Sequence, residues 1–332
     1  MADRDSAFDL GGDAAAGRST GDPASNESRS TAADRNRPRL GSLLPDRDPA
    51  IERDRAGSFI AERVGAAGAD GVVVNMSGGL DSTVTAALAV EALGADRVYG
   101  LILPCNKIGA PHARDAEALA EALDIEHDTV HLQPLFAQFG AVVPDRFDLH
   151  DEPVRSGNAV ARLRMAVAYL AANATNRLVC GTANRSELLL GYLTKHGDGA
   201  ADLFPLGHLY KTDVRALAAD LDVPEFVVEK APTAGFLPGQ RDADDLGAPY
   251  EVVDPVLHLG VDRGLDPESV VERIAAAVAE TDADAGDDSG GDGTPAGELA
   301  AVDRELVADL LGRHRATAHK RLPPPTPDAD LN

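Results

Sequence analysis

The chain has 332 residues, enough for one large domain or two of ordinary size, and 44% of them are hydrophobic. No apolar run approaches the ~20 residues of a membrane-spanning helix, and the polar, acidic N-terminus excludes an ordinary secretory signal. The two cysteines, Cys105 and Cys180, form neither a Cys-x-x-Cys nor a metal-ligand pattern. These features predict a cytoplasmic protein without a membrane partner.

The charge balance is strongly acidic, with 55 Asp and Glu against 31 Lys and Arg and a net formal charge of −24. Such a surface is typical of proteins adapted to a cytoplasm rich in potassium salt. At about 1 M salt the Debye length falls to ~3 Å, so the repulsion between neighbouring carboxylates is screened. An ordinary acidic protein is the alternative interpretation. Lysine is scarce, and its five positions are Lys107, Lys195, Lys211, Lys230 and Lys320.

The first part of the chain divides into a polar arm and a helix. Residues 1–45 lack apolar periodicity and are rich in Asp, Arg, Ser, Gly and Ala, which predicts a disordered arm. A helix is expected from Pro49 to about Gly65, and its apolar face is formed by Ile51, Phe59, Ile60 and Val64. The β-branched run Val72–Val74 predicts the first strand.

Strand and helix patterns then alternate along the chain. This alternation predicts an α/β fold, in which helices flank both faces of a doubly wound parallel sheet. The expected elements are the helix Ser82–Leu93, the strand Val98–Pro104, the helix Pro111–Asp124, the strand Ile125–Leu132, the helix Val154–Asn173 and the strand Arg177–Thr182.

The last third of the chain contains mostly helical patterns. The spacing predicts helices over Leu209–Leu221, Val223–Glu229, residues 250–279 and Asp303–Arg321, the last of them stopped by consecutive prolines. Thr233–Gly247 is rich in Gly, Asp and Pro and predicts a mobile loop. Thr281–Asp303 is expected to be a solvated acidic insertion, and residues 326–332 a flexible tail.

The stretch from Val72 to Thr83 carries the clearest chemical signal. A short strand leads into Ser77–Gly79 and a helix leaves it, so the turn lies at the carboxyl end of a strand, where open α/β sheets bind ligands. Adjacent glycines allow close backbone approach, and N–H groups at a helix start attract anions. The turn lacks the Gly-Lys-Ser/Thr of a Walker A loop, so Asp81 suggests a divalent metal. A plain Gly-Gly turn is the alternative.

The Ser-Gly-Gly-x-Asp-Ser pattern resembles the pyrophosphate loop of the ATP pyrophosphatase superfamily, whose members split ATP between the α and β phosphates. Downstream segments resemble one family within it, the ammonia-dependent NAD synthetases, over roughly residues 50–325. The matching segments are Gly157–Met165, Gly181–Glu187, Gly191–Asp202, Pro205–Lys211, Lys230–Ala234, Gly239–Asp242 and His319–Pro324.

The resemblance implies a Rossmann-like, adenine nucleotide α-hydrolase-like fold with a catalytic domain over residues 46–325. It also implies a C–N ligase that amidates deamido-NAD with ammonia through an adenylated intermediate and releases AMP and pyrophosphate. This would be the last step of NAD biosynthesis. ATP as co-substrate, Mg²⁺ as cofactor and a homodimer are further implications of the resemblance.

The resemblance also implies roles for individual residues. The ATP phosphates would be lined by Asn75, Met76, Ser77, Gly78, Gly79, Leu80, Asp81 and Ser82. Further ATP contacts would come from Thr182, Lys211 and Thr233, and the Mg²⁺ ligands would be Asp81 and Glu187. Deamido-NAD would be held by Arg162, Lys195, Asp202, His319 and Lys320. In a chain poor in lysine, retained lysines inside these segments indicate point charges for phosphates.

Asp198 is the candidate catalytic base. Ammonium dominates near neutral pH and is not a nucleophile, so a base or a desolvating pocket is needed. Asp198 follows Lys195 by three residues in a turn with Gly197 and Gly199. An aspartate that only caps turn N–H groups is the alternative.

Two positions depart from the family pattern, and Lys230 has no assigned role. Relatives commonly carry an acidic residue where this chain has Gly235, and often a Glu where it has Ala243. Both lie in the expected mobile loop.

Two rival functions remain at this point. Another ATP pyrophosphatase, such as a tRNA-modifying enzyme, often needs Cys-x-x-Cys pairs and a basic surface; neither is visible, so no nucleic-acid partner is expected. A non-catalytic nucleotide-binding module would not need Glu187, Lys195 or Lys211.

Overall fold

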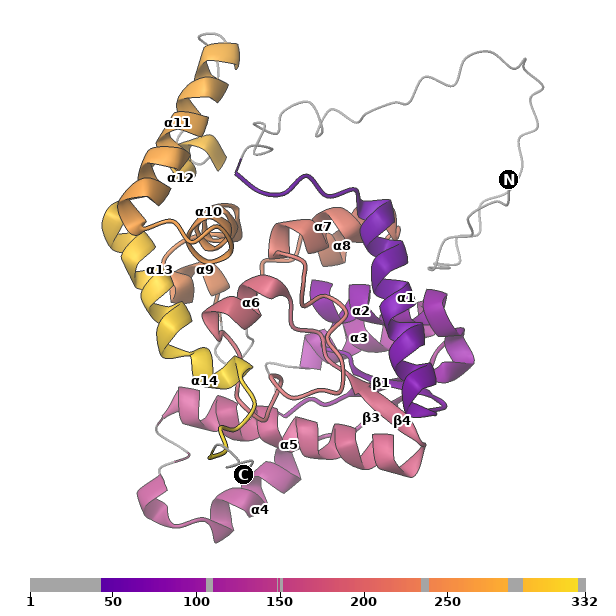
Figure 1. Cartoon of the computed structure of the whole chain (residues 1–332). Helices are drawn as coiled ribbons and strands as arrows, with labels where there is room; N and C mark the ends of the chain where they lie inside the picture. Colours follow the sequence, from indigo (N-terminus) through magenta and orange to yellow (C-terminus); the bar gives the residue numbers. More distant parts are fainter. Residues whose placement is uncertain are drawn as a thin grey trace, which may run out of the picture.

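Four parallel strands form the sheet at the centre of the protein (Figure 1). The computed structural model describes residues 43–105, 110–147, 149, 152–233, 239–285 and 295–327. Within them the strand order is β3-β2-β1-β4, and β1 pairs in parallel with both β2 and β4. The strands are β1 (Gly71–Asn75), β2 (Val98–Ile102), β3 (Glu126–Thr129) and β4 (Arg177–Cys180).

Alternate residues of β1 enter two different cores. Val72 and Val74 pack with one layer of helices, whereas Val73 packs with residues of α5 on the other face. Because both faces are covered, the inner strands β1 and β2 read as nearly continuous apolar runs. The first layer contains α1 (Pro49–Ala67), α2 (Leu80–Leu93), α3 (Ala110–Ala122), α7 (Lys211–Asp220) and α8 (Glu225–Val228). The second contains α4 (Gln133–Val142) and α5 (Pro153–Ala174). The predicted doubly wound α/β fold is confirmed.

A separate helical core lies beside the sheet core. It is built from α6 (Arg185–Leu190), α10 (Tyr250–Leu257), the π-helical segment His258–Asp262, α11 (Pro267–Ala285), α12 (Pro295–Ala300) and α13 (Arg304–Ala316). Helix α7 joins the two cores, because Tyr210 at its start packs in the helical core whereas Val214 packs against the sheet. In Figure 1 these helices stand to one side of the sheet.

Several segments expected to be irregular are ordered, because apolar residues anchor them. Leu43 belongs to the expected arm but is 2% exposed in the helical core. Leu299 and Val302, in the expected acidic insertion, are buried in the same core; Leu299 lies in α12 and Val302 follows it. The expected mobile loop contains α9 (Asp242–Leu246), in which Leu246 is 1% exposed. Four parts of these predictions lie outside the described residues: residues 1–42 of the arm, the centre of the insertion, Gly235 and the end of the tail.

Other differences concern helix boundaries. The expected helix over 250–279 is divided into α10, the π-helical segment and α11. Gly264, at a φ of +70°, lies between the π-helical segment and α11. The last expected helix divides at Thr317 into α13 and α14 (Ala318–Arg321). Helices α4 and α6 were not expected at all.

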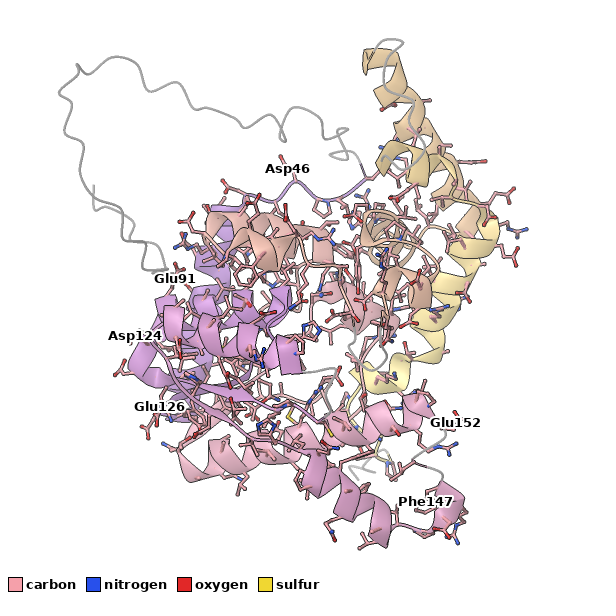
Figure 2. All side chains as sticks on the ribbon, turned by 180° about the vertical axis from the view of Figure 1, so that it is seen from behind. Asp46, Glu91, Asp124, Glu126, Phe147 and Glu152 are labelled. Carbon is pink, nitrogen blue, oxygen red and sulfur yellow. The ribbon has the colours of Figure 1, made fainter. Side chains whose placement is uncertain are left out.

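Many charged side chains lie on the outside of the fold, with Lys211 and Asp254 among the buried exceptions. Figure 2 labels Asp46, Glu91, Asp124 and Glu126, all of which are exposed, on four different segments around the sheet. The acidic residues therefore form a distributed surface rather than one patch. No helix in the part of the chain that the structure describes is both long and apolar enough to span a bilayer.

Candidate active site

The loop between β1 and α2 is held in shape by its own serines. The backbone N–H of Ser77 donates to Ser82 Oγ (3.2 Å), and Ser82 Oγ donates to the carbonyl oxygen of Gly79 (3.0 Å). Gly78 has a φ of +71°, and a Cβ there would lie 2.5 Å from the carbonyl oxygen of His112. Gly79 is the N-cap of α2 and offers no capping side chain, which leaves N–H groups of the first turn for an anion.

A buried lysine joins two carboxylates beside this loop. Lys211, the first residue of α7, is 4% exposed, and its Nζ donates to Asp81 Oδ2. The same Nζ lies 3.7 Å from Glu187 Oε1. Asp81 is in the first turn of α2 and Glu187 in the first turn of α6. Three helix starts therefore converge on one ammonium group.

Asn184 fixes the position of both carboxylates. Its Nδ2 donates to Asp81 Oδ1 (2.9 Å), and its Oδ1 accepts from the backbone N–H of Glu187 (3.0 Å). The Glu187 carboxylate in turn accepts from the backbone N–H of Asn184, which completes a capping box at the start of α6. Asn184 is completely buried, so this arrangement is fixed within the protein rather than at its surface.

The electrostatics of this cluster favour a cation. Burial, reinforced by the charge of Asp81, raises the pKa of Glu187 to about 8. Burial alone would destabilise the Lys211 ammonium, but the two carboxylates outweigh it and raise the pKa of Lys211. Two carboxylates thus share one ammonium, and burial together with the charge of Asp81 disfavours a second negative charge on Glu187. Among the described residues, no group of three or more His, Cys, Asp or Glu is placed to hold a metal ion.

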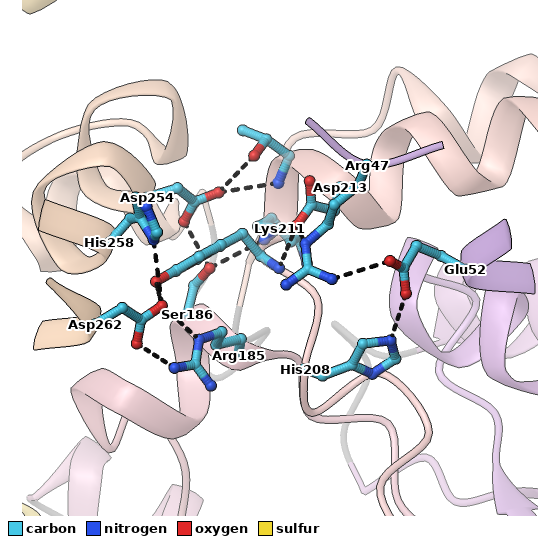
Figure 3. Close-up of polar contacts among 12 residues, drawn as sticks. Arg47, Glu52, Arg185, Ser186, His208, Lys211, Asp213, Asp254, His258 and Asp262 are labelled. Carbon is cyan, nitrogen blue, oxygen red and sulfur yellow. Dashed lines mark hydrogen bonds and ion pairs between the residues drawn. The ribbon is translucent and has the colours of Figure 1, made fainter. Parts of the chain in front are cut away.

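A buried aspartate supports the start of α7 from the helical core (Figure 3). Asp254 of α10 is completely buried, and its carboxylate accepts from Ser186 Oγ (2.6 Å) and from the backbone N–H of Thr212 (3.0 Å). Ser186 Oγ also accepts from the backbone N–H of Lys211 (3.0 Å). Asp254 thus holds Ser186, which precedes Glu187, and Thr212, which follows Lys211.

The segment after α6 gathers the residues expected to bind the second substrate. Arg162 Nε donates to the carbonyl oxygen of Lys195 (3.2 Å), and Asp198 Oδ1 accepts from the backbone N–H of Thr194 (2.9 Å). Asp198 and Arg162 are both exposed to solvent. This cationic segment lies beyond the C-terminal end of α6, whereas Glu187 lies at its start.

The basic residues of α14 bond to carbonyl groups at the end of α6 and just beyond it. Lys320 Nζ donates to the carbonyl oxygens of Gly191 and Leu193, each at 2.7 Å, and Arg321 Nη1 donates to that of Leu189 (2.8 Å). Cations at a helix C-terminus offset its unpaired carbonyls and its dipole. Helix α14 therefore secures the helix that carries Glu187.

Comparison with known proteins decides the family. The family model for NAD synthase matches residues 53–283. The chain belongs to the NAD synthase family. It is 40% identical to the NH(3)-dependent NAD(+) synthetase of Methanosarcina mazei over 277 residues, which cover 83% of this chain and 97% of that one. With the protein of the same name from Halobacterium salinarum it shares 41% identity, over 84% of this chain and 93% of the relative.

Solved structures of similar proteins agree with this placement. The structure of NMN synthetase from Francisella tularensis has a TM-score of 0.66 and 33% sequence identity, and the match covers 86% of this chain and all of that one. NH3-dependent NAD synthetase from Campylobacter jejuni has a TM-score of 0.64 and 27% identity, over 85% of this chain and all of that one. The family and fold predicted from the sequence motifs are both confirmed.

The structure groups the family-implied residues into two sets. Residues of the loop from Asn75 to Ser82 lie with Lys211 and Glu187, since Asp81 belongs to the loop and contacts the lysine. Arg162, Lys195, Asp198 and Lys320 form the second set. Asp202 bonds to the backbone N–H of Val179 (2.7 Å) and is exposed, as are Thr233 and His319. Thr182 is partly exposed after β4.

Sequence reasoning missed two residues that organise the first set. The spacing of Asn184 and Glu187 is that of a capping box, which could have identified Asn184 as an N-cap. Asp254 is a single acid among Val252, Val253 and Val256 in an apolar segment. An acid in such a position is expected to be buried and hydrogen-bonded, and that signal was available.

Asp254 generates a prediction about stability and pH. Burial raises its pKa to about 7, so the folded protein binds this proton more tightly than the unfolded chain. Its contribution to stability is therefore complete below about pH 4 and is lost as the pH rises to about 7. We expect Asp254→Asn to remove this loss, which is on the order of 3 kcal/mol for a buried group. Urea unfolding between pH 4 and 8 in molar KCl measures the free energy of unfolding at each pH.

The exposed Asp309→Asn is the control for this prediction. Identical pH profiles for Asp254→Asn and wild type would contradict the prediction.

Proposed function

We propose that the chain amidates deamido-NAD with ammonia in an ATP-dependent reaction that yields NAD, AMP and pyrophosphate. The observation that carries the proposal is the buried Lys211 bonded to Asp81 beside the Gly78–Gly79 loop, in a chain whose relatives are named NH(3)-dependent NAD(+) synthetases. A cation next to an anion-binding loop is what a leaving pyrophosphate requires.

The first step is adenylation. A carboxylate is a poor electrophile, so an oxygen of the nicotinate carboxylate attacks the α-phosphorus of ATP and pyrophosphate leaves. The N–H groups of the Gly79 loop bind the departing phosphates, and the Lys211 ammonium neutralises charge that develops on them. Thr182 and Thr233 contribute further ATP contacts by family position.

Asp81 and Glu187 are suited to hold Mg²⁺. Two carboxylates that face the same point on separate helices repel each other, and the charge of Asp81 contributes, after burial, to the raised pKa of Glu187, which supports the proposal that a further cation binds there. Carboxylate pairs together with phosphate oxygens are usual Mg²⁺ ligands. When bound, the ion would supply additional positive charge to the phosphates.

The second step is attack by ammonia on the acyl carbon, with AMP as the leaving group. Asp198 is the proposed base, because desolvation by the surrounding protein raises the pKa of its carboxyl group and it lies on the segment of Lys195, within electrostatic reach of Lys320. These lysines and Arg162, with Asp202 and His319, would hold the phosphates and ribose of deamido-NAD. Ammonium would bind to the Asp198 carboxylate and lose a proton to it.

We also propose a homodimer in a salt-rich cytoplasm. Leu135, Phe139 and Val142 recur at helical spacing on α4 and are 45%, 37% and 76% exposed. An exposed apolar stripe at one end of the molecule is suited to a second copy of the chain. Phe147, labelled in Figure 2 beyond the end of α4, extends it and is 46% exposed.

Product analysis tests the proposed reaction against its closest rival. The name of the Francisella tularensis relative makes nicotinate mononucleotide the competing substrate, because its amidation would give NMN. Purified protein with MgATP and ammonium is offered each nucleotide separately. We expect NAD, AMP and pyrophosphate in equal amounts from deamido-NAD and a much lower kcat/KM with the mononucleotide. A preference for the mononucleotide, or release of ADP, would overturn the proposal.

The carboxylate pair generates a prediction about metal dependence. We expect Asp81→Asn and Glu187→Gln each to lower turnover by at least about 100-fold, because each removes a Mg²⁺ ligand and a partner of Lys211. The rate is measured against Mg²⁺ concentration. Glu305→Gln, on the first turn of α13, is the control. Activity near that of the wild type at limiting metal in either variant would exclude this role.

Asp198 generates a prediction about the second step. Asp198→Asn keeps the acceptor for the Thr194 N–H but removes the charge. Adenylation should therefore continue while amide formation slows by at least about 100-fold, within the usual range for a lost base. Hydroxylamine added to the reaction traps the accumulated adenylate. If the variant forms the amide at the normal rate at neutral pH, the residue has only a structural role.

The acidic surface and the α4 stripe generate a prediction about assembly. In molar KCl we expect a dimer with full activity, and in dilute buffer we expect dissociation and lost activity, because unscreened carboxylates repel one another. Sedimentation and activity are measured together. Full activity as a dimer in dilute buffer would contradict salt adaptation.

Two variants separate the stripe from the surface as a whole. Val142→Asp places a charge in the stripe and should leave a folded monomer in molar KCl. Phe226→Asp, at a 51% exposed position on α8 at the other end of the molecule, is the matched control and should leave the dimer intact.

A further inference from the structure

Lys230 connects the end of α8 to the phosphate loop. It lies two residues beyond α8, and its Nζ donates to the carbonyl oxygen of Gly78 (3.0 Å), 152 residues earlier in the chain. The same Nζ lies 2.8 Å from Asp115 Oδ2 on α3. A lysine in a lysine-poor chain thus bonds to the backbone of the loop rather than extending into solvent.

The bond to Gly78 determines the direction of the next N–H group. In a trans peptide the carbonyl oxygen and the following N–H point in opposite directions, and the described residues contain no cis peptide. Holding the Gly78 oxygen toward Lys230 therefore directs the Gly79 N–H away from it. The acceptor of that N–H is Ser77 Oγ, at a long 3.4 Å, which a phosphate oxygen would readily replace.

Gly78 needs such a restraint because of its conformation. Its φ of +71° is accessible to glycine, but glycine also adopts many other conformations at little energetic cost. A flip of the peptide between Gly78 and Gly79 would present a carbonyl oxygen, which repels phosphate, in place of an N–H. A charge-assisted hydrogen bond from Lys230 opposes this flip.

The ion pair with Asp115 does not account for the position of Lys230. The two side chains are 24% and 37% exposed, and ion pairs at such positions contribute little to stability. Asp115 instead limits the directions in which the ammonium points. The bond to Gly78 is the contact with a functional consequence.

We propose that Lys230 is a positioning residue for ATP: its bond to the Gly78 carbonyl keeps the Gly79 N–H directed at the triphosphate. The same bond attaches the loop to the segment that contains Thr233, three residues further on. The inference rests on the proposed function, since it requires that this loop bind the ATP phosphates.

Steady-state kinetics in molar KCl test the proposal. We expect Lys230→Met to raise the KM for ATP about tenfold or more, the size of a lost hydrogen bond to a charged group, with the KM for deamido-NAD and kcat within about threefold of wild type. Lys230→Arg keeps the charge and donors and should restore most of the affinity for ATP.

Two control variants separate this role from a general structural effect. Asp115→Asn removes the ion pair but leaves the bond to Gly78, and should change the KM for ATP less than about twofold. Arg97→Met removes a cation that donates to the carbonyl oxygens of Asp70 (2.7 Å) and Ala69 (3.3 Å) at the opposite end of β1. It should leave the KM for ATP unchanged. An equal effect from either control, or an unchanged KM for ATP in Lys230→Met, would overturn the proposal.

A binding measurement distinguishes failure of this inference from failure of the proposed function. Inorganic pyrophosphate is titrated calorimetrically into wild type and Lys230→Met without turnover. Weaker binding only in the variant supports the role of Lys230. If the wild type binds pyrophosphate but makes no NAD, the proposed function fails. If both proteins bind pyrophosphate equally, the inference about Lys230 fails.

Discussion

The fold around the site depends on one buried ammonium. Lys211 Nζ bonds to Asp81 and lies 3.7 Å from Glu187, although Lys211 begins a helix, where the dipole disfavours a cation. Both acids lie in the first turns of other helices, where the dipole favours them. Removing one partner of such a buried pair typically costs about 3–5 kcal/mol, because it leaves an uncompensated charge. The three helix starts are therefore held together by the same groups that would meet the ATP phosphates.

Strand order explains why residues far apart in the chain meet. β1 and β4 are neighbours in the sheet, with β4 at its edge, and more than a hundred residues separate Asp81 from Asn184, yet the two side chains are hydrogen-bonded at 2.9 Å. The segments that follow the two strands diverge to different layers of helices. The site thus lies where the sheet core meets the helical core, and α7, with Tyr210 at its start, contributes residues to both cores.

The sheet, its covering helices and the phosphate loop could be predicted because their signals are local. Apolar runs and the Ser77–Gly79 turn determine them without reference to the rest of the chain. The capping box of Asn184 and Glu187 is also local, but the bond from Asn184 to Asp81 and the bonds from Asp254 to Ser186 and Thr212 join distant segments, so spacing alone could not place those partners. Composition also misled: Leu246 and Leu299 lie in stretches rich in Gly, Asp and Pro, yet a single buried leucine anchors each to the helical core.

Attachment of α14 to α6 has a consequence for how the protein acquires its site. The C-terminal carbonyls of α6 receive hydrogen bonds from His314, Thr317, Lys320 and Arg321, all more than a hundred residues later. Synthesis proceeds from the N-terminus, and domains begin to fold during it. All four described strands are synthesised well before the residues that supply these partners. The helix that carries Glu187 therefore obtains its full set of hydrogen-bond partners only after residues 314–321 have been made.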